Sequence, residues 1–153
     1  LLFVSNPSYV NINSSHDFEG FNVLIYHGFS FPYYADRVER IRQAGGLKRI
    51  DLVMLYLLQR RHLAPAHGST LYIPDDDFLV IDKIPDFFIS GHTHNVSLSS
   101  YKNITCINSS CWVTQTEDQE RRGIVPEPGR VVVVNLKDRA TNIINFENEK
   151  QTD

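Results

Sequence analysis

The sequence predicts a mixed α/β fold in which a mixed sheet packs against helices, and three observations support it. Short apolar runs typical of buried strands alternate with two segments of helical spacing in the first part of the chain. Beyond those segments the pattern becomes rich in strands up to the carboxyl terminus. The 153 residues are 42% hydrophobic and 22% charged, which is the composition of one globular domain of ordinary size.

The strands are expected in the following order. An apolar run over residues 2–5 ends at the turn signal of residues 6–8, and the mostly apolar run 21–26 predicts a central strand. Residues 74–77 and 114–129 are polar and predict surface loops. Further strands are expected over residues 78–81, 87–89, 104–107, 130–136 and 142–146, the last two forming a hairpin across residues 137–139.

Two helices are expected between the second strand and the first polar loop. Asp36 could cap a helix that ends at Gly45-Gly46, and Asp51 could cap a second helix that ends before Pro65. The residues expected to form their apolar faces are Val38, Ile41 and Ala44 in the first helix, and Leu52, Leu55, Tyr56 and Leu58 in the second.

The predicted domain covers residues 1–147, and residues 148–153 are expected to form a frayed tail. The chain begins inside an apolar run and without a methionine, so we expect it to be a piece of a longer protein. No apolar run approaches the ~18 residues of a membrane span, and no signal-peptide pattern is present, so no membrane association is expected.

Composition also limits the partners. The formal net charge is −3, so any attraction for phosphate groups must be local, as at Arg60-Arg61 or Arg121-Arg122. Cys106 and Cys111 are too close in sequence to staple a domain and lack the paired spacing of a zinc site. Reduced thiols are expected, which fits a cytoplasmic protein.

The most informative motif is Gly91-His92-Thr93-His94, directly after the strand expected at 87–89. The glycine allows a sharp turn, and residues two apart in extended backbone point to the same side. His27-Gly28 follows the central strand in the same way. His27, His92 and His94 could therefore converge at one edge of the sheet and bind zinc, manganese, iron or nickel. The alternative for His27 is an ordinary strand-end histidine, and for His92 and His94 it is that one faces the core and the other solvent. His16, His62 and His67 are expected to be ordinary surface or packing residues.

Three histidines allow either one hydrolytic zinc ion with an open coordination position or part of a two-metal site. Two divalent ions carry four positive charges, so a two-metal site also requires carboxylates. The available acidic residues lie in polar loops and turns, where solvated carboxylates are expected; they are Asp75, Asp76, Asp77, Asp82 and Asp86.

The two histidine motifs, at 26–28 and 91–94, are similar to the last two motifs of calcineurin-like metallophosphoesterases. Within that superfamily, the blocks at residues 4–7, 57–65 and 108–116 resemble the small subunit of archaeal family-D DNA polymerases. The resemblance covers nearly the whole chain. Arg-Arg-His-Leu-Ala-Pro at 60–65 and the segment from Trp112 to Thr116 are its most specific parts.

The resemblance implies the carboxyl half of a calcineurin-like phosphoesterase domain, a layered β-sandwich of mixed sheets flanked by helices. It implies two divalent ions, manganese first and zinc, iron or nickel as alternatives. His27 and His92 would bind one ion and His94 the other. The catalytic residues and a bridging carboxylate are expected upstream of Leu1, so the isolated chain is expected to be inactive. The complete protein would hydrolyse DNA from its 3′ end.

The resemblance also implies two partners, the large catalytic subunit of the polymerase and a DNA 3′ end. Arg60, Arg61 and His62 are candidates for substrate binding, although cations at a helix carboxyl terminus also have a local electrostatic role. Two alternative functions remain: a non-catalytic scaffold subunit of a polymerase, and a phosphoesterase acting on other phosphate esters. Trp112 is expected to lie in the core rather than to stack on a base.

Overall fold

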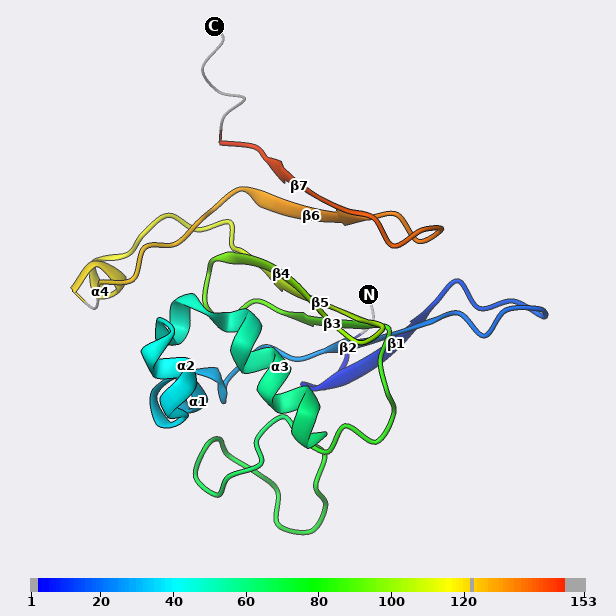
Figure 1. Cartoon of the computed structure of the whole chain (residues 1–153), viewed down its shortest axis with the longest axis horizontal. Helices are drawn as coiled ribbons and strands as arrows, with labels where there is room; N and C mark the ends of the chain where they lie inside the picture. Colours follow the sequence, from blue (N-terminus) through cyan, green and yellow to red (C-terminus); the bar gives the residue numbers. More distant parts are fainter. Residues whose placement is uncertain (1–2, 122, 148–153) are drawn as a thin grey trace, which may run out of the picture.

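The computed structural model describes residues 3–121 and 123–147, and it has mixed α/β content (Figure 1). A five-stranded mixed sheet lies at the centre, with helices on one face and a two-stranded hairpin over the other. This confirms the predicted α/β class, with one mixed sheet where mixed sheets were expected, because the hairpin strands pair antiparallel. Leu1, Leu2 and the predicted tail at 148–153 lie outside the described residues, and the domain boundary at residue 147 stays a prediction.

Three parallel strands form the middle of the sheet. Across the sheet the order is β1 (Ser8–Ile12), β2 (Phe21–Ile25), β3 (Phe87–Ser90), β5 (Ile104–Ser109) and β4 (Val96–Tyr101). β2, β3 and β5 are parallel to one another, whereas β1 and β4 pair antiparallel at the two edges. Parallel strands end at the same edge of a sheet, so the segments that follow β2 and β3 lie next to each other.

Each face of the sheet covers its own group of apolar side chains. Leu24, Phe88 and Cys106 form one row across the parallel strands and pack with the helices. On the other face, Val23 and Phe87 pack with the hairpin of β6 and β7. The bounds of the hairpin strands are Arg130–Val134 and Thr141–Asn145, close to the prediction.

The first predicted helix is two helices. α1 (Phe31–Arg37) begins earlier than expected because Pro32 occupies its first turn, where proline is favoured. Asp36 therefore lies inside a helix and does not cap one. Val38 takes an extended conformation, which separates α1 from α2 (Glu39–Gln43). A short 3₁₀ turn, η1 (Gly46–Lys48), follows at the predicted glycine pair.

The second predicted helix is confirmed as α3 (Ile50–Arg60), but its buried face is rotated from the expected one. Leu52 and Tyr56 are only partly buried, beside that face. The buried residues are spaced three and four apart, as one face of a helix requires, and they are Ile50, Val53, Met54, Leu57 and Leu58.

Two strand predictions are wrong, and two strands, β1 and β4, were missed. Residues 3–5 are not a strand; β1 starts after Pro7 and pairs with β2. Residues 78–81 form only an isolated bridge, between Val80 and His62, because this segment pairs with the chain leaving α3 and not with a sheet. The other missed strand is β4, whose three serines hide its alternation of apolar residues.

The polar segment 114–129 is a loop, as predicted, apart from one short helix, α4 (Glu117–Arg121). Trp112 precedes this loop and is 72% exposed, so the expectation that it lies in the core is wrong. The chain leaves the sheet after β5, and the indole ring lies near Phe146, with ring centroids 6.1 Å apart. Throughout the described part of the chain, every helix is too short or too polar to cross a bilayer.

The two cysteines are free, and they should react at very different rates. Burial raises the pKa of the Cys106 thiol from 9.0 to about 11, and its side chain is 2% exposed. At pH 8 this leaves about a hundredfold less thiolate than an ordinary cysteine has. We expect iodoacetamide to label the half-buried Cys111 first, as followed by mass spectrometry of the folded chain. Equal labelling rates at the two positions would contradict this packing of Cys106.

Candidate functional site

His27 and His92 meet at the carboxyl edge of the parallel strands. The backbone N–H of His92 donates to the carbonyl oxygen of His27 at 3.0 Å, which continues the pairing of β2 and β3 beyond the sheet. The side chains also touch, with His92 Nδ1 at 3.0 Å from His27 Nε2 and the ring centroids 4.9 Å apart. Two imidazole nitrogens that bind one ion at about 2.1 Å and at right angles are separated by about 3 Å. The pair therefore has the spacing of two ligands of a single ion.

The electrostatic surroundings favour the neutral form of His92. Burial of its half-buried ring lowers its pKa, and the charges of His27 and then His94 lower it further. Neutral imidazole is the form that binds a divalent ion. The position of His92 therefore prepares it for metal binding at neutral pH.

Gly28 makes the close approach of the two histidines feasible. Its φ is +109°, and a Cβ at this position would lie 2.9 Å from the Cβ of His92 and 3.0 Å from the Phe31 ring. Gly91 was expected to allow the turn after β3, but it has no positive φ. The left-handed residue of that turn is His94, with a φ of 56°. The loop gains its shape from contacts made around His94 rather than from a flexible glycine.

Segments distant in sequence hold His94. Its carbonyl oxygen accepts the Glu127 N–H at 2.8 Å, and its Nδ1 lies 2.8 Å from Nε2 of Gln119. Gln119 and Thr116 form a capping box at the start of α4, in which the Gln119 Oε1 accepts the Thr116 N–H. Because the Gln119 oxygen accepts from Thr116, the group of Gln119 that faces His94 is the NH2, which donates to His94 Nδ1. A neutral His94 ring that accepts at Nδ1 carries its proton on Nε2.

The structure brings the three predicted ligands to one edge, but only His27 and His92 are in contact through their rings. Among residues 3–121 and 123–147, no group of three or more histidine, cysteine, aspartate or glutamate side chains has the geometry to hold a metal ion. Among the described residues, the site thus consists of two imidazoles in contact, with His94 beyond them in the same loop and no carboxylate beside them.

The acidic residues lie elsewhere, as expected. Asp77 Oδ2 is 2.9 Å from His62 Nε2, and Asp75 and Asp76 are exposed in the same loop. Asp86 forms an ion pair with Arg139 and accepts the backbone N–H of Asn22. Asp86 precedes β3, so it lies at the edge of the sheet opposite the histidines. These carboxylates have structural partners or face solvent.

Arg60 and Arg61, two of the candidates for substrate binding, have partners within the chain. The guanidinium carbon of Arg60 lies 3.5 Å from the centre of the Tyr56 ring. Arg61 is left-handed and completes a Schellman motif at the end of α3, and its guanidinium donates to the carbonyl oxygen of Ile81. Arg61 also lines a hollow of about 380 Å³ with Asp86 and Asn103, which precede β3 and β5.

His62, the third candidate, donates to Asp77 while its Nδ1 accepts the Ala64 N–H. The three candidates are therefore engaged locally, and the hollow beside Arg61 lies at the opposite edge of the sheet from the histidine pair. Contact with substrate phosphates stays a prediction. Of the second arginine pair, Arg121 lies 3.5 Å from Glu117 and Arg122 lies outside the described residues.

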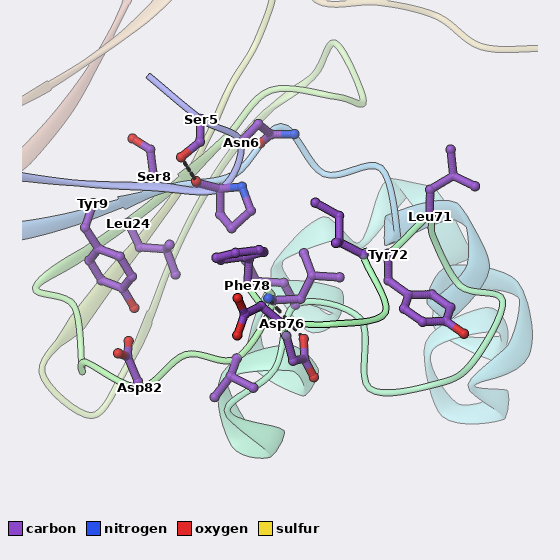
Figure 2. Close-up of a pocket in the computed structure, with 16 residues that line it drawn as sticks. Ser5, Asn6, Ser8, Tyr9, Leu24, Leu71, Tyr72, Asp76, Phe78 and Asp82 are labelled. Atoms are coloured by element: carbon purple, nitrogen blue, oxygen red, sulfur yellow. Dashed lines mark hydrogen bonds between the residues drawn. The ribbon is translucent and has the colours of Figure 1, made fainter. Parts of the chain in front are cut away.

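A larger hollow, of about 680 Å³, lies between the start of the chain and the loop after α3 (Figure 2). Its walls are mostly apolar and include Leu71, which is 96% exposed, together with Tyr72 and Phe78. None of the six predicted site residues lines it. Its connection to the histidines runs through Asn6, whose Oδ1 accepts the backbone N–H of His27 at 2.8 Å.

Sequence reasoning missed three polar residues that support the site: Asn6, Asn108 and Gln119. Asn6 was interpreted as part of a turn and of the block at 4–7, without a role at the histidine site. The spacing Thr116-x-x-Gln119 is a capping-box signal that could have located α4. Asn108 has no comparable signal, because a single polar residue at the end of a strand is ordinary in sequence.

The close approach at Gly28 can be tested by Gly28→Ala against Gly68→Ala. Gly68 also has a positive φ, of +79°, but an added Cβ would meet open space there, so backbone strain is the only cost. Strain of this kind costs about 1–3 kcal/mol at either position. At Gly28 the clashes with the Cβ of His92 and with the Phe31 ring should together add about 1–3 kcal/mol. Urea denaturation measures both losses, and equal losses would show that the contact with His92 is unimportant.

No protein-family model matches the chain. Curated archaeal proteins named DNA polymerase II small subunit do match it. The protein of Archaeoglobus fulgidus is 39% identical over 132 residues, which is 85% of this chain and 25% of the relative. That of Thermoplasma acidophilum is 35% identical over 148 residues, which is 95% of this chain and 30% of the relative.

A third relative, from Methanothermobacter thermautotrophicus, is 39% identical over 135 residues, covering 87% of this chain and 26% of the relative. The chain thus spans between a quarter and a third of the length of these relatives, and it matches their carboxyl-terminal part. The histidine pair lies within a sequence that is similar to them over most of its length. Over most of its length, the chain is therefore similar to the carboxyl-terminal part of archaeal proteins named DNA polymerase II small subunit.

Proposed function

We propose that this chain provides part of the metal centre of a 3′–5′ exonuclease in the small subunit of an archaeal replicative DNA polymerase. The observation that carries the proposal is the His27–His92 pair, with nitrogens 3.0 Å apart at the carboxyl edge of parallel strands. Its support in sequence is the similarity to polymerase small subunits over most of the chain. A protein of this kind acts in the cytoplasm, on DNA.

The complete centre holds two divalent ions, with manganese first and zinc, iron or nickel as alternatives. His27 and His92 would hold one ion and His94 the other, and a ligand role for His94 Nδ1 would require loss of its contact with Gln119. When bound, such ions polarise a phosphodiester and activate a water molecule for in-line attack. The carboxylates and the catalytic acid or base come from segments other than the described residues.

The role of this chain's residues is to bind and orient. His27 and His92 present two neutral nitrogens from a rigid strand edge, and burial of His92 favours that neutral state. The partners proposed for the complete protein are the large catalytic subunit of the polymerase and a DNA 3′ end. A non-catalytic scaffold needs no such pair of imidazoles, and a phosphoesterase for other substrates does not explain the similarity to polymerase subunits.

Metal binding by the isolated chain tests the ligand assignment. We expect weak binding of one Mn²⁺ ion, and His27→Ala or His92→Ala should each weaken it at least tenfold, which is about 1.4 kcal/mol. His16→Ala is the matched control, because His16 is an exposed histidine that pairs only with Asp17. Electron paramagnetic resonance of free Mn²⁺ gives the affinities. Equal affinities for all variants would refute the assignment.

Nuclease activity is tested with a chimera in which this chain replaces the matching part of the Archaeoglobus fulgidus small subunit. We expect Mn²⁺-dependent shortening of a 5′-labelled single strand, and at least a hundredfold less of it, about 2.7 kcal/mol, in the His92→Ala chimera. A folded chimera that binds the large subunit without cleaving DNA would support the scaffold instead. The isolated chain should be inactive, and metal-dependent turnover by it would contradict the incomplete site.

The arginines are tested through the salt dependence of DNA binding by the same chimera. If Arg60 contacts a phosphate, Arg60→Ala should make the slope of log affinity against log salt shallower by about 0.7–0.9. Arg40→Ala, which removes an exposed arginine of α2, controls for net charge. An unchanged slope would leave Arg60 with only its contact to Tyr56.

A further inference from the structure

A buried polar cluster lies beneath the loop that carries His92 and His94. Its centre is Asn108 of β5, which is 0% exposed, and Ser90 at the end of β3 is also buried. A buried amide is unfavourable unless its donors and acceptor find partners. Asn108 and Ser90 lie beside an apolar core, so their polar atoms depend on one another and on the loop above for partners.

The side chain of Asn108 forms its hydrogen bonds with residues in, or directly before, the loop at 91–95 that carries His92 and His94. Its Oδ1 accepts the Ser90 hydroxyl at 2.8 Å, and Ser90 directly precedes Gly91. Its Nδ2 donates to Thr93 Oγ1 at 2.8 Å and to the carbonyl oxygen of Asn95. Thr93 and Asn95 flank His94. One side chain therefore holds both the start of the loop and its far end.

The pairing of β3 with β5 explains why Asn108 can do this. Ser90 and Asn108 are register partners in these parallel strands, at the edge where the histidines lie. The next residue, Ser109, donates through its hydroxyl to the Ser90 carbonyl oxygen at 3.0 Å. The start of the loop at 91–95 is thus held to β5 by hydrogen bonds of Ser90 with Asn108 and Ser109.

We propose that Asn108 is a positioning residue of the metal centre, which holds the loop at 91–95 so that His92 stays against His27. This rests on the proposed function, since it assigns Asn108 a role in the same site. The left-handed backbone of His94 is unfavourable for a residue with a side chain, and it persists only where surrounding contacts maintain it. Asn108 supplies those contacts from below, while Glu127 holds the His94 carbonyl from the loop after β5.

An amide is the side chain that this position requires. Asn108 uses its oxygen as an acceptor and its nitrogen as a donor within the same cluster. A carboxylate of the same shape would accept the Ser90 hydroxyl but could not donate to the Asn95 carbonyl oxygen. A leucine would fill the volume and leave the Ser90, Thr93 and Asn95 groups without their partner.

The experiment compares Asn108→Leu with Ile104→Ala, a control that destabilises the same strand from its opposite end. Ile104 is buried in the core between sheet and helices, at the start of β5. Loss of a residue that orients metal ligands typically lowers metal affinity by 10- to 100-fold. We expect a loss of about that size in Mn²⁺ affinity for Asn108→Leu, and less than a twofold change for Ile104→Ala.

A second readout needs no metal. The His92 amide, which donates to His27, should exchange with deuterium at least tenfold faster in Asn108→Leu than in Ile104→Ala, as measured by hydrogen exchange. Thr93→Val removes one hydroxyl of the cluster and should give a smaller change in the same direction, so the proposal stays testable if Asn108→Leu does not fold.

The outcomes separate this proposal from the proposed function. If His92→Ala leaves Mn²⁺ binding unchanged, the metal assignment fails, and the exchange rates of the His92 amide still decide whether Asn108 holds the loop. If His92→Ala abolishes binding while folded Asn108→Leu and Thr93→Val keep both wild-type affinity and slow exchange, Asn108 is a structural residue only and the positioning role is refuted.

Discussion

The pairing of two parallel strands determines the geometry of this site. β2 and β3 are far apart in sequence, yet their hydrogen bonds continue past the last residue of β2, because the Tyr26 N–H donates to the Ile89 carbonyl oxygen and the His92 N–H to that of His27. A backbone hydrogen bond between the two histidines themselves limits how far their side chains can separate. The distance between the rings therefore follows from the pairing of these strands together with the contacts that hold the loop at 91–95.

The same strands show how an apolar core gives way to a polar site. Leu24, Phe88 and Cys106 occupy the middle of β2, β3 and β5 and are buried against the helices. Toward the carboxyl edge, Ser90 and Asn108 take the corresponding positions and remain just as buried. Burying these groups is favourable only because they satisfy one another and the loop above them. Rigidity of the histidine loop is the physical consequence.

Residues of the loop at 114–129 also hold the loop that carries His92 and His94. The Val96 N–H donates to Glu127 Oε2 at 2.8 Å, and Glu127 also forms an ion pair with Arg130. Gln119 reaches His94 from the short helix in the same segment. A region that looks like an ordinary surface loop in the sequence thus defines the orientation and tautomer of one histidine.

The sequence by itself determined the fold class, the central strand β2, helix α3, the final hairpin and the three candidate ligands. These depend on local patterns: apolar runs, helical spacing, and histidines placed directly after strands. Only the tertiary structure decided that His27 and His92 touch, that Arg61 is used to end α3, and that Asn108 lies beneath the loop. Each of these depends on which strands are neighbours and in which register, and hydrogen bonds between residues far apart in sequence leave no periodic signal along the chain.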